Sequence, residues 1–193
     1  YTFRDGTDIF VTRLSSDGST LIASTLIGGT KNDGVITKES PLCFNYGDQL
    51  RGDINIDEEN NVYIVSTTSS DDFPIKDGFQ QVYGGGNSDA VIVKLSPNLD
   101  NIIWSSYFGG NDAETGLSIK RDKENNIYIT GGTNSTDVTL EELPGTFKKG
   151  KSDAYILHID KTGTNLKNSL RYGTEELDQA YFLDIDNEGN IYT

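Results

Sequence analysis

The hydrophobic residues of this chain fall in short runs that alternate with polar positions and recur at a fixed spacing. Six runs carry the pattern: Asp8–Leu14, Asp89–Leu95, Asp153–Ile159, Asn61–Thr67, Asn126–Gly132 and Asn190–Thr193. The interval from Asn61 to Asn126 is 65 residues, and the interval from Asp89 to Asp153 is 64. Short runs rich in β-branched and aromatic residues predict strands. Their recurrence predicts an all-β repeat protein.

Each repeat is predicted to contain four strands, which we name A to D in chain order. The A–B turns read DEENN over 57–61, DKENN over 122–126 and DNEGN over 186–190. Their fourth residue is Asn60, Asn125 or Gly189, types that tolerate a left-handed backbone. Tight hairpins of this kind predict a β-propeller of four-stranded antiparallel blades.

The order of predicted strands divides the chain into about three blades' worth of a partial propeller over 1–193. Residues 1–29 are expected to form strands C and D of one blade, 30–47 an inserted loop, 48–110 and 111–174 complete blades, and 175–193 strands A and B of the next. Propellers usually contain about four to eight blades. We therefore expect further blades from adjoining sequence or from another chain.

Several motifs resemble the SBBP repeat, a β-propeller repeat of bacteria and archaea. They are D-A-x-[VI]-x-K-L, S-P-N-L, W-S-S-Y-F-G-G and N-N-I-Y-I-T-G-G-T, joined by DDFP at 71–74 and YGGGNSDA at 83–90. The third unit departs from the pattern over 136–154. The resemblance implies a large secreted or cell-surface bacterial protein, often with a type IX secretion signal. It implies no catalytic residues.

The charge and composition of the chain limit the classes of partner that it can bind. The chain has 16 Lys and Arg against 30 Asp and Glu, a net charge of −14. This balance argues against nucleic acid and anionic membranes, which bind cationic patches. No apolar stretch is long enough for membrane insertion. The single cysteine, Cys43, excludes an internal disulfide.

One face of the propeller is predicted to carry the long loops, because the B–C connections over 66–88 and 132–152 and the insertion lie at the same end of the strands. Elaborated loops on a rigid scaffold commonly bind a partner, here a protein or a glycan. The binding-face candidates are Asp71, Asp72, Phe73, Phe79, Tyr83, Glu141 and Glu142. The alternative is that these loops only cover the ends of the blades.

Metal and catalytic chemistry have little support in the sequence. Asp184, Asp186 and Glu188 resemble the start of a calcium loop. Lys120 takes the position of Asp184 in a neighbouring repeat, which favours a plain turn over a calcium loop. No cofactor is expected, with calcium as the weak exception. The only histidine, His158, is expected to be a half-exposed strand residue, which argues against a Ser-His-Asp site.

The sequence favours a non-enzymatic extracellular or cell-surface module that serves binding, adhesion or scaffolding within a larger protein. A propeller-type glycosidase or lyase is the first alternative, since two converging carboxylates would suffice. The other alternative is a lectin, which would repeat an aromatic and polar constellation in each blade. The loops differ between repeats, which counts against a lectin.

Overall fold

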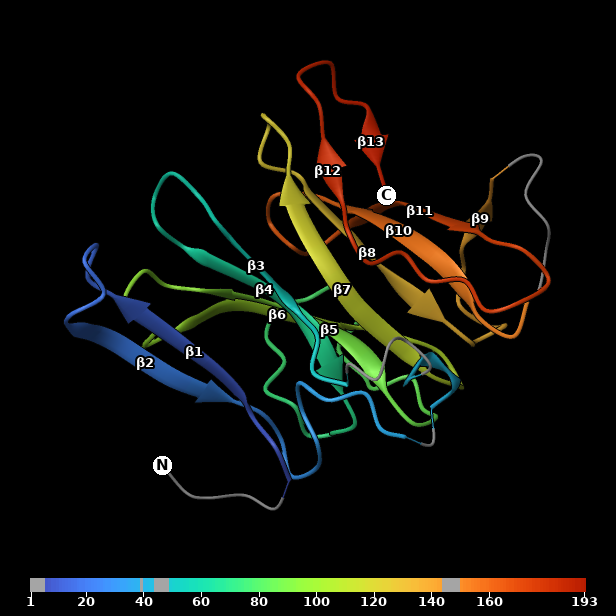
Figure 1. Cartoon of the computed structure of the whole chain (residues 1–193), viewed down its shortest axis with the longest axis horizontal. Helices are drawn as coiled ribbons and strands as arrows, with labels where there is room; N and C mark the ends of the chain where they lie inside the picture. The colour runs from blue at the N-terminus through green and yellow to red at the C-terminus, as the bar shows by residue number, and fades with distance from the viewer. Residues whose placement is uncertain (1–5, 39, 44–48, 144–149) are drawn as a thin grey trace.

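The computed structural model describes residues 6–38, 40–43, 49–143 and 150–193. These residues form strands and one short 3-10 helix, η1 (Pro41–Cys43) (Figure 1). The prediction of an all-β chain with antiparallel sheets is confirmed. The expected inserted loop over 30–47 lies partly outside the described residues. No helix in the described ranges has the length and apolar character needed to cross a membrane.

Four sheets follow one another along the chain. The first pairs β1 (Ile9–Leu14) with β2 (Leu21–Ile27), and the second has the order β3 (Asp53–Ile56), β4 (Val62–Thr68), β5 (Asp89–Leu95) and β6 (Ile102–Phe108). The third has the order β7 (Glu114–Arg121), β8 (Ile127–Thr133), β10 (Asp153–Ile159), β11 (Leu166–Tyr172) and β9 (Glu141–Glu142). The fourth pairs β12 (Asp184–Ile185) with β13 (Ile191–Tyr192).

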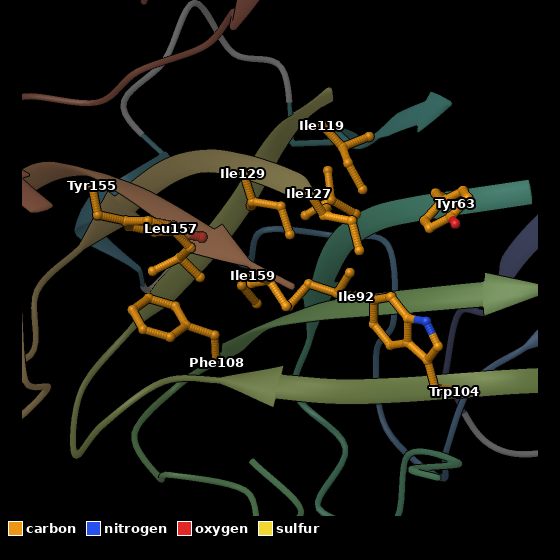
Figure 2. Close-up of a cluster of buried hydrophobic side chains, with 12 residues drawn as sticks. Tyr63, Ile92, Trp104, Phe108, Ile119, Ile127, Ile129, Tyr155, Leu157 and Ile159 are labelled. Carbon is orange, nitrogen blue, oxygen red and sulfur yellow. The ribbon is translucent and has the colours of Figure 1, made fainter. Parts of the chain in front are cut away.

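The second sheet lies in the middle of the hydrophobic core, and its strands send alternate side chains to opposite faces. Ile92 and Val65 join residues of the third sheet, among them Ile119, Ile127 and Leu157, in one buried cluster (Figure 2). Val91 belongs to a second cluster that reaches the first sheet. Alternation therefore packs the second sheet against both the first and the third.

Trp104 lies between the second and third sheets. Its side chain is 3% exposed, and its ring centroid is 6.3 Å from that of Tyr63 (Figure 2). A Cβ at Gly163, in the β10–β11 turn, would lie 2.3 Å from the indole ring. This tryptophan therefore packs between neighbouring sheets.

The A–B hairpins form as predicted. Asn60 has φ 65°, Asn125 has φ 67° and Gly189 has φ 89°, all in the left-handed region. In the first of these turns, Asp57 accepts hydrogen bonds from the backbone N–H groups of Glu59 (3.1 Å) and Asn61 (2.7 Å). The carboxylate satisfies the donors of its own turn, which is the usual function of Asp at this position.

The long B–C connections return along the outer edges of their own sheets. Lys76 and Ser105 exchange backbone hydrogen bonds of 3.4 Å and 2.8 Å beside β6. In the third sheet, β9 pairs in parallel with β11. A sheet edge with unpaired backbone groups invites aggregation, and these connections cover it. The binding-face candidates Glu141 and Glu142 belong to such a connection, and their backbone completes the edge of the third sheet.

Candidate functional site

The aromatic residues chosen from the long loops point into the protein. Phe73 is 4% exposed, and its ring centroid is 6.4 Å from that of Tyr107. Tyr83 is half-buried against the same ring at 5.7 Å. Phe79, also half-buried, packs against the core cluster shared by the second and third sheets. The expectation that Phe73 offers an exposed ring is wrong, because its connection folds back onto β6.

The acidic residues chosen from the same loops lie at the surface. Asp71 is exposed and forms an ion pair of 2.9 Å with Lys31, which lowers the pKa of that carboxyl. Glu141 and Glu142 are exposed on β9. The predicted set thus divides: the acids face solvent, and the rings are wholly or partly buried.

Asp72 has a structural role at this surface. Its Oδ1 accepts hydrogen bonds from the backbone N–H (2.7 Å) and the hydroxyl (3.1 Å) of Thr30. Thr30 belongs to the connection that leaves the first sheet, whereas Asp72 follows β4 of the second sheet. This side chain therefore ties two sheets together.

Asp72 is one member of a larger polar arrangement. Asp33, which is 1% exposed, accepts hydrogen bonds from the backbone N–H of Gly29 (2.7 Å) and from the hydroxyls of Thr68 and Ser70. Ser70 Oγ in turn accepts the backbone N–H of Lys31 at 3.0 Å. A G-x-x-x-D segment from one sheet is thus held by a T-x-S-x-D segment from the next. We call this arrangement the inter-sheet latch.

A second latch joins the second and third sheets. Glu114 takes the position of Asp33 and accepts the backbone N–H of Gly110 at 2.7 Å and the hydroxyl of Thr133. Ser135 Oγ accepts the backbone N–H of Asp112 at 2.9 Å. Asp137 Oδ1 completes the set by accepting the backbone N–H of Asn111 at 3.0 Å. The latch is therefore a repeated feature of the chain.

One segment of the chain matches a known protein family, and it contains the second latch. Residues 103–137 match the SBBP family model, a beta-propeller repeat. The chain therefore carries an SBBP repeat, as its motifs indicated. The matched segment runs from β6 through β8 and includes Gly110 and Glu114 together with Thr133, Ser135 and Asp137. Both halves of the second latch thus lie within the SBBP repeat. No curated protein matches the chain significantly.

Sequence reasoning missed the latch, although the signal was present. Thr68-x-Ser70-x-Asp72 and Thr133-x-Ser135-x-Asp137 recur 65 residues apart. These residues open the two long loops, whose lengths and later sequences differ. In the third unit Thr174 replaces the second glycine, and its backbone N–H still donates to Asp178 Oδ2 at 2.6 Å.

A second buried acid lies beside the latch acid. Asp89 begins β5, is 0% exposed and accepts the backbone N–H of Gly84 at 2.7 Å. Burial raises its pKa to about 7, and the charge of Glu114 adds to the rise. Burial also raises the pKa of Glu114. A Cβ at Gly109 would lie 2.3 Å from Asp89 Oδ1, so only glycine fits there.

Asp89 and Glu114 resemble a catalytic constellation in one respect, since carboxylates with perturbed pKa values often mark active sites. Both Asp89 and Glu114 are 0% exposed. A substrate reaches neither carboxylate while the sheets remain packed. The pair is therefore a structural element of the interface between sheets.

The weak calcium candidates are engaged in the turn of the fourth sheet. Asp186 accepts the backbone N–H groups of Glu188 and Asn190, each at 2.9 Å, and the hydroxyl of Tyr192 at 3.0 Å. Hydrogen bonds from Asn190 are the main reason that the pKa of Asp186 is lowered to about 2. Asp184 is exposed. Within the described residues, no group of three His, Cys, Asp or Glu side chains is arranged to hold a metal.

His158 is a half-buried strand residue, as expected. Its ring stacks on that of Tyr128 with centroids 4.4 Å apart and an angle of 11° between the planes. Burial lowers the pKa of the imidazole. The histidine therefore takes part in a cross-strand packing pair.

The short turns and the long connections lie at opposite ends of the sheets (Figure 1). We call the end with the long connections, together with the outer sheet edges that these connections cover, the loop edge. Its exposed acids include Asp71, Asp77, Asp112, Asp137, Glu141, Glu142, Glu175 and Glu176. Close to them, Lys31 pairs with Asp71, and Lys151 lies 3.8 Å from Glu176. The loop edge is therefore an anionic surface.

Proposed function

We propose that this chain is a non-enzymatic module of a secreted or cell-surface β-propeller and that it binds a protein partner through the loop edge. The four-stranded second sheet and the third sheet, in which β9 adds a fifth strand, are the complete blades, and the SBBP match supports this assignment. One observation carries the binding role: the loop acids face solvent, whereas Phe73 is buried and Tyr83 half-buried. Recognition through this surface is electrostatic.

The chemistry of the loop edge favours a cationic protein surface as the partner. The net charge of −14 repels nucleic acid and anionic membranes. A glycan usually stacks on an exposed aromatic ring. Phe73 and Tyr83 do not provide an open platform of that kind, so a glycan has less support.

The absence of catalysis is also part of the proposal. Asp89 and Glu114 carry perturbed pKa values, yet both are fully buried and accept hydrogen bonds from the loop backbone. General acid and base groups must reach the substrate directly or through one water. The geometry of this pair therefore supports a structural role.

Charge reversal tests the proposal. Asp71→Lys, Glu141→Lys and Glu142→Lys are combined in one variant of the loop edge. The matched control combines Glu59→Lys, Glu124→Lys and Glu188→Lys, which change the net charge equally at the short A–B turns. Binding to an immobilised oligolysine peptide is measured by biolayer interferometry at low and high salt.

We expect the loop-edge variant to lose about tenfold or more in affinity and the control to lose about threefold or less, because close charge complementarity decides binding. Added salt should weaken the wild-type complex, since the groups are exposed. An equal loss in both variants would contradict the proposal, because net charge alone would then explain binding.

A further inference from the structure

A groove lies between β6 of the second sheet and β11 of the third sheet. Its volume is about 450 Å³, and its apolar lining consists of Phe79, Phe108, Val138 and Leu166. Ligand pockets in proteins usually have volumes of about 300–1,000 Å³. The groove is therefore large enough to receive a group from a partner.

The floor of the groove belongs to the hydrophobic core. Phe108 is 3% exposed, and its ring centroid lies 4.8 Å from that of Tyr155 (Figure 2). Phe79, Val138 and Leu166 are partly buried and pack against the cluster that contains both rings. An apolar group that enters the groove therefore joins an existing hydrophobic cluster.

The long connection of the second sheet forms one wall of the groove. The backbone N–H of Gln80 donates to Ser106 Oγ at 2.8 Å, and the backbone N–H of Tyr107 donates to the Gln80 carbonyl at 3.0 Å. The side-chain amide of Gln80 exchanges hydrogen bonds of 3.1 Å and 3.2 Å with the backbone of Gly109. These bonds fix the wall that carries Phe79 to β6.

The long connection of the third sheet forms the opposite wall. Ser169 Oγ donates to the Thr139 carbonyl at 2.9 Å, and Glu141 pairs with Leu170 two residues further along the connection. Both walls are thus tied to a sheet edge in the free protein. Preorganisation of this kind lowers the entropy cost of binding.

Exposed acids accompany the lining residues in both walls. They are Asp77, Asp137 and Glu141, all members of the loop edge. Asp77 lies two residues before Phe79, and Asp137 directly precedes Val138. The groove therefore combines an apolar floor with an anionic rim.

Two lysines close in sequence to the lining residues are engaged in hydrogen bonds. Lys76 Nζ donates to the Ile102 carbonyl at 2.7 Å, and Lys167 Nζ donates to Asn126 Oδ1 at 2.8 Å. The acids of the rim thus remain open to cations from a partner.

A larger side chain fills the equivalent position between the first and second sheets. The latch residues align the two long connections, which places Val138 at the position of Phe73. Phe73 is 4% exposed and packs in the cluster that reaches the first sheet. The fold therefore accepts an aromatic ring at this repeat position, and the smaller Val138 leaves room for a ring from outside.

We propose that the groove receives an aromatic side chain of the protein partner, from a segment in which lysines or arginines flank that aromatic residue. The ring packs against Phe79 and Val138, and the flanking cations meet the acids of the rim. The inference rests on the proposed function, because it names the anchor of the partner that binds the loop edge. Buried aromatic anchors commonly supply most of the binding energy of an interface, whereas the surrounding charges steer the encounter.

Two peptides of equal charge test the inference. One is oligolysine with a single central phenylalanine, and the other has alanine at that place. Biolayer interferometry should show that the wild-type chain binds the phenylalanine peptide about tenfold or more tightly than the alanine peptide, because burial of a ring is worth at least that factor. The ratio should persist at high salt, since salt screens exposed charges and leaves apolar burial in place.

A variant that fills the groove should remove this preference. Val138→Phe introduces the residue type that the chain carries at the equivalent Phe73, and its affinity for the alanine peptide should change by about threefold or less. The matched control is Val82→Phe, the same substitution at a loop residue that is 76% exposed and lies outside the lining of the groove. The control should keep the preference for phenylalanine.

A photo-cross-link locates the aromatic group independently of the variants. The peptide then carries benzoylphenylalanine at its centre, and the cross-linked segments of the wild-type chain are identified by mass spectrometry. They should contain residues 79–80, 138–139 or 164–166, which line the groove. If Val138→Phe fails to fold, the cross-link decides.

Equal affinity of the wild-type chain for the two peptides would overturn the inference. Cross-links confined to other segments, or a preference that survives in folded Val138→Phe, would also overturn it.

The loop-edge lysine variant separates this result from the proposed function. If that variant weakens the alanine peptide more than the A–B turn control does, while phenylalanine gives no advantage, the groove is no anchor site and the proposed function stands. If both charge variants weaken the alanine peptide equally, while Val138→Phe alone removes the preference for phenylalanine, the proposed function fails and the groove still receives the ring.

Discussion

At the scale of single residues, the most telling feature is the placing of carboxylates where water does not reach. Asp33, Asp89 and Glu114 are at most 1% exposed. Each accepts at least one backbone N–H, as buried polar groups must. An unpaired buried acid would be costly. The interface between sheets is therefore held by specific hydrogen bonds as well as by apolar contact.

Asp89 should make stability fall as the pH rises. Its pKa is raised from 3.8 to about 7 by burial and by Glu114, so the folded state retains a proton that the unfolded state releases. The free energy of unfolding therefore falls between about pH 4 and pH 7, by at most about 1.4 kcal/mol per pH unit. Asp89→Asn should remove this part of the dependence. Urea denaturation of both proteins at pH 5 and pH 8 measures it.

The difference between Asp89→Asn and wild type should grow in favour of the variant as the pH rises. If the difference in the free energy of unfolding stays constant between pH 5 and pH 8, the prediction is wrong, because Asp89 would then be ionised throughout this range.

Truncation of Glu114 should be costly. Glu114→Ala leaves the Gly110 N–H and the Thr133 hydroxyl without their acceptor inside the protein. We expect a loss of about 3 kcal/mol in the free energy of unfolding, since each orphaned group costs about 1–3 kcal/mol. Chemical denaturation measures the loss. Glu124→Ala, in an exposed turn, serves as the control and should change stability by less than about 0.5 kcal/mol.

At the scale of elements, the left-handed backbone of the A–B hairpin turns leads to a testable prediction. Asn60 has φ 65°, and the equivalent residue of the last turn is Gly189. Asn60→Gly should be tolerated within about 0.5 kcal/mol, whereas Asn60→Val should cost about 1–3 kcal/mol, because a β-branched residue strains this backbone. Thermal unfolding of both variants separates the two cases. Equal stability of the valine and glycine variants would show that the turn does not constrain its backbone.

The strands and hairpins were predictable because their signals are local. The apolar, β-branched run in Asp89–Leu95 and the turn residues Asn60 and Asn125 each act within a few positions. The burial of Phe73 and the pairing of β9 were not predictable in this way. They depend on where a long connection returns across the sheet, and periodicity carries no information about that path.

The candidate site was predicted only in part for the same reason. The exposed acids Asp71, Glu141 and Glu142 were found, since charged loop residues usually face water. The latch joins residues that are about 20 to 40 positions apart, such as Asp33 with Ser70 and Glu114 with Thr133. A comparison of the repeats position by position would have shown both halves of it.

At the scale of the whole molecule, the exposed apolar residues gather in the incomplete sheets. Phe10 is 65% exposed in β1, whereas its equivalent Val91 in β5 is 0% exposed. Side chains of this size are worth about 1.5–3 kcal/mol each when buried. The first and fourth sheets therefore present apolar surface of the kind that the second and third sheets bury against their neighbours.

Hydrogen–deuterium exchange at the second latch tests this account most directly. The backbone N–H groups of Gly110 and Asn111 donate to Glu114 at 2.7 Å and to Asp137 at 3.0 Å. If these carboxylates hold neighbouring sheets together, peptides spanning 109–113 should exchange slowly in the wild-type protein and faster in Glu114→Ala, while peptides spanning 57–61 stay unchanged. Equal exchange of the 109–113 peptides in both proteins would contradict the account.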